Sequence, residues 1–424
     1  MKIIILILLC VMTLLTAQPQ FDGYLQNWTA IRADEDPDYM MLRNRFRLNT
    51  TISGDWTRGY ASFDVSDDLL IEGSPEMTLR ELFLDIYFDK VDLRIGKQQV
   101  VWGKADGVFI NDIVNPLDLR YFLLQDFEDI RIGIPMVKAS VYTETLVLEA
   151  IWIPKFEPWR FAEQGSDWAF YQPQAFITPT GVEIPLAWGK SEEPPSKLQN
   201  SEYGLKLSGF AFGTDYSFLF LQSYQDRYLV SMDIDTLNLE DPPVKIKVYS
   251  YFRRVNMFGL NFSKPVLGAV FRGEFGYFPD YYFNVDPKVT FSTIVFDDNT
   301  CMLGYFQGML ALDISGPWGS TISTQYIRKQ ILDYVDTIQK ANEVEEWMTL
   351  MISGTFWNET ASARWLMLYD TTEESGLSRM IFGYEIADNV SAEFGVDLIW
   401  GNEENIFGQF DSNDNVYFKL MYSF

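Results

Sequence analysis

The chain has 424 residues, of which 47% are hydrophobic and 16% aromatic, and its formal net charge is −26. Nucleic acids and anionic lipid surfaces need a basic face on their protein partner, so this charge argues against both. It fits a surface that binds divalent cations, a lumen that favours cations, or a soluble acidic protein. The sequence contains no histidine and two cysteines, which argues against histidine-dependent catalysis and against zinc, copper or haem binding.

The chain starts with one lysine, an uninterrupted apolar run and the small residue Ala17. This arrangement is typical of a secretory signal peptide, and the run is shorter than the roughly 20 apolar residues that a spanning helix needs. Cys10 lies inside the run with almost no room before it, which disfavours a lipoprotein anchor. We expect residues 1–17 to be removed and residues 18–424 to form one exported domain with a single thiol, Cys301.

Short segments that alternate apolar and polar residues recur along the exported part, and helical periodicity is almost absent. Examples are RELFLDIYF from Arg80, YSFLFLQSY from Tyr216 and SRMIFGYEIADNVSAEFGVDLIW from Ser378. The pattern predicts an all-β chain, a transmembrane antiparallel β-barrel of about 18 strands, with about 16 as the alternative. A secreted β-sandwich shows the same alternation but rarely carries so many aromatic residues toward its strand ends.

Tight turns and long acidic or aromatic connections alternate along the chain. The predicted tight turns lie at 53–55, 89–90, 213–215, 264–265, 316–317, 358–359 and 388–389. The predicted long connections lie at 104–136, 154–200, 226–243, 280–299, 329–345 and 401–414. This asymmetry indicates an outer-membrane barrel with short periplasmic turns and long extracellular loops.

The last strand, NVYFKLMYSF, places Phe418, Leu420, Tyr422 and Phe424 on one apolar face. It resembles the C-terminal signature of outer-membrane barrels. The barrel-assembly machinery recognises this signature. The resemblance implies location in the bacterial outer membrane, with the membrane lipid and the assembly machinery as partners.

Charged residues of the early strands fall on the face opposite the apolar residues. In LRNRFRL, three arginines alternate with apolar or uncharged residues, so the lipid-compatible orientation points them into the lumen. We call Arg43, Arg45 and Arg47 the basic ladder. Facing rows of opposite charge tune selectivity in a pore, whereas solvated pairs contribute about 0 to 1 kcal/mol each and have no such role. The predicted pore-lining residues are Arg43, Arg45, Arg47, Glu81, Asp85, Asp92 and Arg94.

A strand is expected to run to about Trp102, and the apolar stretch LRYFLL that follows it is too apolar for a free loop. We therefore expect a segment at 104–136 to fold into the barrel mouth and narrow it. Its candidate residues are Trp102, Gly103, Asp112, Asn115, Pro116 and Asp118.

This part of the chain resembles a broad, largely uncharacterised family of porin-like outer-membrane proteins. The resemblance rests on an Arg-x-Gly-x-Gln strand from Arg94, the Trp-Gly pair at Trp102 and an Asn-Pro-x-Asp-Leu segment from Asn115, over about fifty residues. Lys104 departs from the pattern, because many members carry an acidic residue after Trp-Gly. The resemblance implies a channel-like barrel with an inserted constriction, and it implies no substrate.

Acidic stretches at 33–38 and 411–415 offer oxygen ligands for a divalent cation, with solvated loops as the alternative interpretation. No other cofactor is expected, and no enzyme. The sequence favours a porin for passive diffusion of small hydrophilic solutes or ions. The alternatives are a non-conducting or gated barrel of an export or envelope-assembly system, and a secreted β-rich binding protein. Association into homo-oligomers is left open.

Overall fold

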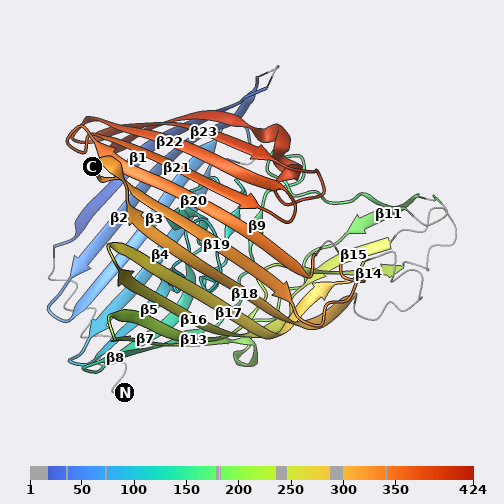
Figure 1. Cartoon of the computed structure of the whole chain (residues 1–424), viewed down its shortest axis with the longest axis horizontal. Coiled ribbons are helices and arrows are strands. Elements are labelled where there is room, and N and C mark those ends of the chain that lie inside the picture. The colour runs from blue at the N-terminus through green and yellow to red at the C-terminus, as the bar shows by residue number, and fades with distance from the viewer. Residues whose placement is uncertain are drawn as a thin grey trace.

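The computed structural model describes residues 18–34, 37–71, 74–177, 181, 183–234, 246–286, 299–339 and 341–424. Eighteen strands form one antiparallel sheet that closes on itself, and Figure 1 shows the resulting barrel from the side. β1 (Gln20–Arg32) pairs with both β2 (Tyr39–Ser53) and β24 (Asn415–Ser423), which closes the sheet. The predicted fold and strand number are confirmed, whereas the predicted signal peptide lies outside the described residues.

The other wall strands, in chain order, are β3 (Thr57–Asp68), β4 (Glu76–Tyr87), β5 (Val91–Gln98), β7 (Ile134–Tyr142), β8 (Leu146–Ile153), β12 (Glu202–Ala211), β13 (Thr214–Tyr224), β16 (Arg254–Val266), β17 (Ala269–Asn284), β18 (Thr300–Ser315), β19 (Thr321–Ile331), β20 (Val344–Phe356), β21 (Ala361–Asp370), β22 (Ser375–Ala387) and β23 (Val390–Trp400). Shorter elements belong to the connections: β6 (Asp118–Leu119), α2 (Phe127–Ile130), β9 (Arg160–Phe161), β10 (Ala175–Ile177), β11 (Glu183–Trp188), η1 (Leu198–Asn200), β14 (Leu229–Ile234), β15 (Ile246–Tyr251), η2 (Pro317–Gly319) and η3 (Gly408–Asn413). No helix in the described ranges is long and apolar enough to cross a membrane.

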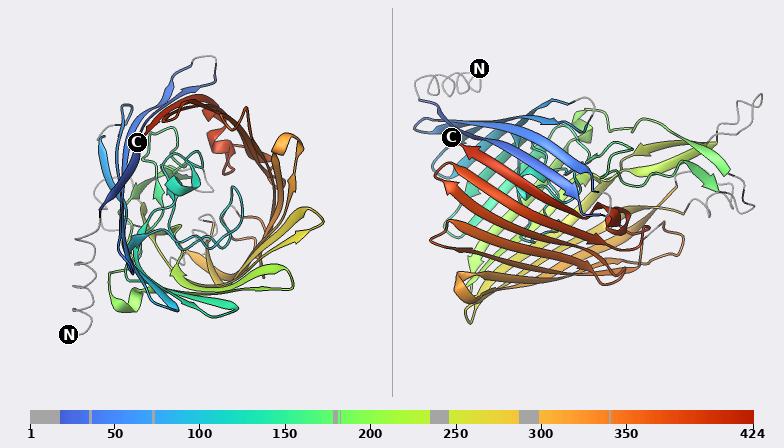
Figure 2. Two further views of the ribbon diagram at one scale, coloured as in Figure 1. Left: turned by 90° about the vertical axis from the view of Figure 1, so that its left-hand side faces the viewer. Right: turned by 90° about the horizontal axis from the view of Figure 1, so that it is seen from above.

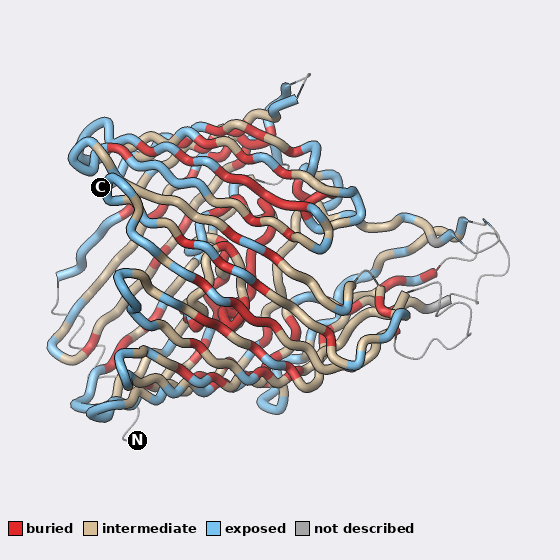
Figure 3. The backbone as a smooth tube through the Cα atoms, in the orientation of Figure 1, coloured by how far each residue is buried: buried red, intermediate tan, exposed pale blue. Residues whose placement is uncertain are grey.

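Side chains of the wall strands alternate between an apolar outer face and the barrel interior. In β24, Phe418, Leu420 and Tyr422 are exposed on the outside, while Tyr417 and Lys419 are buried inside. Buried, intermediate and exposed residues are interspersed along the barrel strands in Figure 3. A closed sheet with an apolar outer face satisfies every condition for spanning a lipid bilayer, so the protein is a transmembrane barrel of the bacterial outer-membrane type.

Short turns gather at the barrel end that holds the C-terminus, and the longer connections gather at the other end (Figure 1). The turn predicted at 264–265 is wrong, because Lys264 and Pro265 lie within β16. Leu267 and Gly268 form this turn, with φ angles of 50° and 85°. A two-residue hairpin turn of this kind needs positive φ at both positions, and proline is fixed near −65°.

The connection between β5 and β7, residues 99–133, folds inside the barrel (Figure 2, left). Two clusters of apolar side chains surround this connection inside the barrel. One cluster includes Trp28, Met41, Tyr121, Phe122 and Leu124, and the other Val100, Trp102, Ile134, Ile151 and Leu221. At the extracellular end, β10, β11, β15 and β14 form a small separate sheet that projects from the barrel (Figure 1).

Candidate functional site

Asn115 ties the two ends of the inserted segment 99–133 together. Its side-chain nitrogen donates hydrogen bonds to the carbonyl oxygens of Gln98 and Ile132, and its side-chain oxygen accepts one from the amide of Val100. The carbonyl of Pro116, next to it, accepts a hydrogen bond from Ile132. These bonds join the residue that ends β5 to the residues that precede β7, so they define where the segment leaves and rejoins the wall.

Trp102 and Asp112 hold the first part of the segment against the inner wall. The indole nitrogen of Trp102 donates to Glu149 of β8 at 2.5 Å, and its backbone amide donates to Asp112. The other carboxylate oxygen of Asp112 accepts two hydrogen bonds from Arg131, at 2.5 and 2.7 Å. A Cβ at position 103 would lie 2.6 Å from the Cβ of Asp112. The backbone at Gly103 can therefore approach Asp112 this closely only because the residue is glycine.

Farther along, the segment reaches the opposite wall and is fixed there by buried hydrogen bonds. Glu274 of β17 accepts from the backbone amides of Lys104 and Asn111, at 2.6 and 2.5 Å. The side chain of Asn111 donates to Asn261 of β16 at 2.6 Å. Gln307 of β18 donates to the carbonyl oxygen of Ile110 at 2.7 Å. The segment therefore spans the lumen from β5 to β18.

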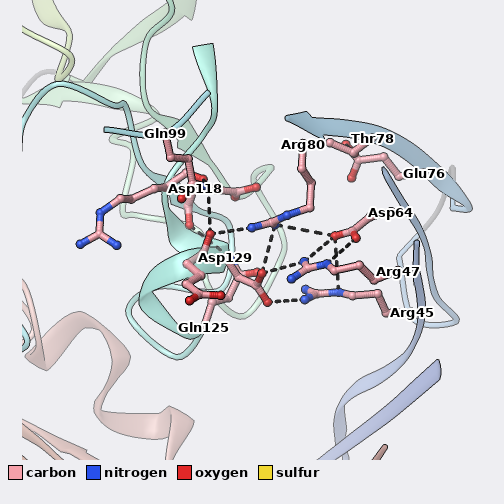
Figure 4. A network of polar contacts seen from close by, with 12 residues as sticks. Arg45, Arg47, Asp64, Glu76, Thr78, Arg80, Gln99, Asp118, Gln125 and Asp129 are labelled. Atoms are coloured by element: carbon pink, nitrogen blue, oxygen red, sulfur yellow. Dashed lines mark hydrogen bonds and ion pairs between the residues drawn. The ribbon is translucent and has the colours of Figure 1, made fainter. Parts of the chain in front are cut away.

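Asp129 fixes α2 to the wall on the other side of the lumen. Its carboxylate pairs with Arg45, with Arg47 at 2.7 Å and with Arg80 at 3.0 Å, and Arg47 also donates two hydrogen bonds to Asp64 (Figure 4). Burial alone would raise the pKa of Asp129, but the charges of the three arginines, Arg45 foremost, outweigh it and hold the pKa well below its ordinary value. The basic ladder is thus a docking surface for α2.

Arg80 points into the lumen because β4 carries a β-bulge. Ser62 of β3 pairs with Glu81 and the next residue of β3 pairs with Leu79, so Arg80 has no partner residue on β3. Leu79 is exposed on one side of the bulge and Leu82 on the other. Both Arg80 and Glu81 can therefore point inward. In a regular strand only one of two consecutive side chains can point into the lumen. Arg80 was therefore not predicted as a pore-lining residue.

The other predicted pore-lining residues fall into two groups. Arg43 is buried, donates to Gln125 and lies 4.8 Å from the ring of Tyr121, so it contacts the inserted segment. Glu81 accepts a hydrogen bond from the amide of Gln99 at the start of that segment. Asp85, Asp92 and Arg94 lie near the β4–β5 turn, where Arg94 donates two hydrogen bonds to Asp85 and Tyr142 donates one to Asp92.

The side of α2 that faces away from the basic ladder makes longer and more exposed contacts. Asp126 lies 3.6 Å from Arg364 and 3.8 Å from Lys419, and 55% of its side chain is exposed. Lys419 in turn lies 3.5 Å from Glu393. A cavity of about 180 Å³ lies between α2 and the strands β1, β2, β23 and β24. The charged residues that line it are Arg47, Lys419, Asp126, Glu128, Asp129 and Glu393, four acids and two bases, so its field favours cations.

Aromatic residues of two extracellular connections cover the inserted segment. The ring of Phe122 lies 4.7 Å from that of Phe410 in η3 and 6.1 Å from that of Phe170. The ring of Trp168 lies 5.7 Å from Phe410. These rings belong to three connections far apart in the sequence, so the connections pack on one another above the lumen. Tyr121, Phe122 and Leu124 of the LRYFLL stretch are buried beneath these rings.

Arg32, at the extracellular end of β1, links three connections. It donates hydrogen bonds to Asp38 at 2.8 Å, to Asp167 at 2.7 Å and to the side chain of Asn413 at 2.8 Å. Asn413 also donates to the carbonyl oxygen of Asp167. A single guanidinium thus holds together three connections, two of which carry the rings of Phe170 and Phe410 that cover the inserted segment.

The acidic stretches proposed for divalent cations are only partly described. In the first stretch, Glu35 and Asp36 lie outside the described residues, and Asp38 pairs with Arg32. In the second, Asp414 accepts a hydrogen bond from the amide of Ile399. Within the described part of the chain, no group of three or more histidine, cysteine or acidic side chains is placed to hold a metal ion.

Residues 14–365 match the family model DUF1302, which is described as a protein of unknown function. The chain belongs to this family. No curated protein matches the sequence. Solved structures with a similar fold include OccAB4 of Acinetobacter baumannii, with a TM-score of 0.53 and 11% identity over 96% of this chain and 99% of that one. OccK8 (OprE) of Pseudomonas aeruginosa has a TM-score of 0.50 and 9% identity over 96% and 98% of the two chains. These similarities concern the fold, a porin-like barrel, and the DUF1302 match agrees with the resemblance to an uncharacterised family.

Proposed function

We propose that this DUF1302 protein is a channel of the outer membrane through which small hydrophilic solutes and ions diffuse passively. The observation that carries the proposal is the unequal anchoring of α2 inside the barrel. Asp129 ties one side of the helix to buried arginines, whereas Asp126 on the other side faces a charged cavity across contacts of 3.6 and 3.8 Å. The path of the solute runs along this weakly held side.

The charges of the path favour cations over anions. The lining of the cavity holds four acids against two bases, Arg47 and Lys419. Arg364, close to Asp126, adds one more base, so the acids still outnumber the bases. Fixed charge at the narrowest part of a water-filled path sets its ion preference.

A liposome-swelling assay tests passive diffusion directly. Purified protein is reconstituted in vesicles, and the initial swelling rate is recorded in isosmotic solutions of neutral sugars of increasing size. We expect the rate to exceed that of protein-free vesicles for the smallest sugars and to fall as the sugar grows. Equal rates with and without folded protein would refute the proposal.

A second candidate function is a gated barrel of an export or envelope-assembly system. The rings of Phe122, Phe170 and Phe410 favour this candidate, because they pack together over the lumen. We call these three residues the aromatic cover. This candidate predicts vesicles that swell only after the cover is loosened, for example by Phe410→Ala, and a periplasmic partner that copurifies with the barrel. Passive diffusion predicts swelling without any substitution.

In either case the lipid-facing terminal residues Phe418, Leu420, Tyr422 and Phe424 would direct insertion by the assembly machinery. All four are exposed on the outer surface, which suits recognition before the strand is paired. Replacing Phe424 with alanine should lower the amount of folded protein in the outer membrane, whereas the channel properties of the molecules that do insert should stay the same.

A further inference from the structure

Four periplasmic turns each place a bulky apolar residue at their tip. Phe212, Leu267, Trp318 and Trp357 have φ angles of 53°, 50°, 56° and 55°. This left-handed region is normally occupied by glycine or asparagine, and a bulky residue there is strained. Phe212 is 96% exposed, Leu267 fully exposed, Trp318 94% and Trp357 67% exposed. The protein therefore holds four large apolar side chains in positions that its own chain does not cover, at a cost in backbone energy.

The four tips lie side by side along one arc of the barrel rim. They belong to the turns β12–β13, β16–β17, β18–β19 and β20–β21, and these hairpins are joined by the pairs β13–β16, β17–β18 and β19–β20. A Cβ built at Gly213, Gly268 or Gly319, the glycines beside three of the tips, would meet no atom within 4 Å. The tips therefore project freely from the rim.

Outside this arc, polar residues dominate the turn tips, and the β2–β3 turn of Gly54, Asp55 and Trp56 leaves its tryptophan only partly exposed. Glu144 and its threonine neighbours form the β7–β8 turn, and the β22–β23 turn consists of Asp388 and Asn389. The β4–β5 turn has Phe88, which is 49% exposed, beside exposed Asp89 and a lysine. Apolar tips are thus concentrated on the arc from β12 to β21.

The apolar arc is continuous with the lipid-facing surface of the barrel. The ring of Trp357 lies 5.4 Å from that of Phe356, which lies 6.1 Å from that of Phe382 on the outer face of β22. Val266, next to the tip residue Leu267, is also exposed on the outer face, and Ile314 is exposed close to the β18–β19 turn. The apolar surface does not stop before the tips, as it would if they hung below the membrane in water.

We propose that Phe212, Leu267, Trp318 and Trp357 insert into the periplasmic leaflet and anchor this arc of the rim in the phospholipid interface. Tryptophan and phenylalanine are the residues that membrane proteins place at that level. The continuity with the lipid-facing surface favours lipid over a periplasmic protein as the occupant. The arc from β12 to β21 then sits deeper in the bilayer than the turns with polar tips, so the barrel axis is tilted.

Site-directed fluorescence tests this proposal on the intact chain. Cys301 is the one cysteine outside the expected signal peptide, so Cys301→Ser gives a background into which single cysteines are introduced. Phe212→Cys, Leu267→Cys and Trp318→Cys report on the apolar tips, with Glu144→Cys and Asp388→Cys as matched controls in polar turns. Each variant is labelled with an environment-sensitive dye and reconstituted in phosphatidylcholine vesicles. Heat-modifiable migration on gels verifies that each barrel is folded.

We expect the dye at the three apolar tips to emit at shorter wavelength than at the controls. Nitroxide lipids should quench it more than aqueous iodide does, and the controls should show the reverse. Strong quenching by iodide with little quenching by nitroxide lipid at the tips would overturn the proposal and leave the arc as a surface for a periplasmic protein. Equal lipid quenching at tips and controls would also overturn it, because the anchoring would not be confined to the arc.

Discussion

The carboxylate of Asp129 in α2 and the guanidinium of Arg47 in β2 lie 2.7 Å apart inside the barrel. Only 11% and 10% of the two side chains are exposed, so the pair is screened little by water or salt. It joins the inserted segment to a wall strand more than 80 residues earlier in the chain. The position of α2, and with it the width of the path, therefore depends on this pair and its neighbours.

Replacing Asp129 with asparagine should release α2 from the wall. The substitution leaves the surrounding arginines with one fewer buried counter-charge, and breaking a buried ion pair in this way typically costs about 3–5 kcal/mol. We expect noisier single-channel current and a lower temperature of unfolding on heat-modifiability gels. Asp126→Asn is the matched control, since its exposed contacts contribute about 1 kcal/mol or less. An equal loss of stability in both variants would contradict this assignment.

Acidification should leave the docking of α2 unchanged over the physiological range. The pKa of folded Asp129 is lowered by its arginine partners, so its stabilising effect is complete above the unfolded pKa, near about 4. The effect is lost only as the pH falls through the lower, folded pKa. Current noise attributable to α2 should therefore be the same at pH 7 and pH 5. A rise in noise between those values that is absent in Asp129→Asn would show that this carboxylate titrates earlier.

Removing acids from the cavity should reduce its preference for cations. Glu128→Gln and Glu393→Gln each remove one negative charge from the lining, and we expect the cation-to-anion permeability ratio to fall by about twofold for each. Reversal potentials in a potassium chloride gradient measure the ratio. Asp388→Asn makes the same charge change in a turn outside the lumen and should leave the ratio unaltered. If all three variants behave alike, the cavity does not lie on the path.

Arg32→Ala should loosen the extracellular cover without unfolding the barrel. The substitution removes the hydrogen bonds to exposed Asp38 and Asp167 and to buried Asn413, so the free energy of unfolding should fall by about 1–3 kcal/mol, mainly through Asn413. We expect faster proteolytic cleavage in the connection between β8 and β12. Lys155→Ala, in the same connection, serves as the control. Cleavage at the wild-type rate in Arg32→Ala would remove Arg32 as the link between the connections.

The barrel could be predicted from the sequence because its determinants are local. Alternation along β22, β23 and β24 places apolar side chains on one face, and a lipid-facing strand requires that pattern. The inward direction of Arg45 and Arg47 follows from the same rule. The only sequence signal of the bulge at Arg80 is the three-residue spacing of Leu79 and Leu82, which breaks the alternation of two. The turn at Leu267 contradicts ordinary turn preferences.

The content of the lumen was harder to predict than its wall. The motif residues Trp102, Asp112 and Asn115 indicated an inserted segment, and the structure places all three in its framework. The partners of the segment on the far wall lie far along the chain, Glu274 170 residues from Lys104 and Gln307 197 residues from Ile110, and no spacing rule connects them. The basic ladder was predicted to line the pore, but its pairing with Asp129 could not be predicted, because Asp129 lies within a short acidic stretch that indicated neither a helix nor an ion pair.

Single-channel recording tests the central claim most directly. Purified wild-type protein is inserted in a planar bilayer with a potassium chloride gradient across it, and folding is verified on the same preparation. We expect discrete current steps and a reversal potential on the cation-selective side. Folded barrels that remain electrically silent would contradict passive diffusion, and steps with an anion-selective reversal potential would contradict the path along Asp126, Glu128 and Glu393.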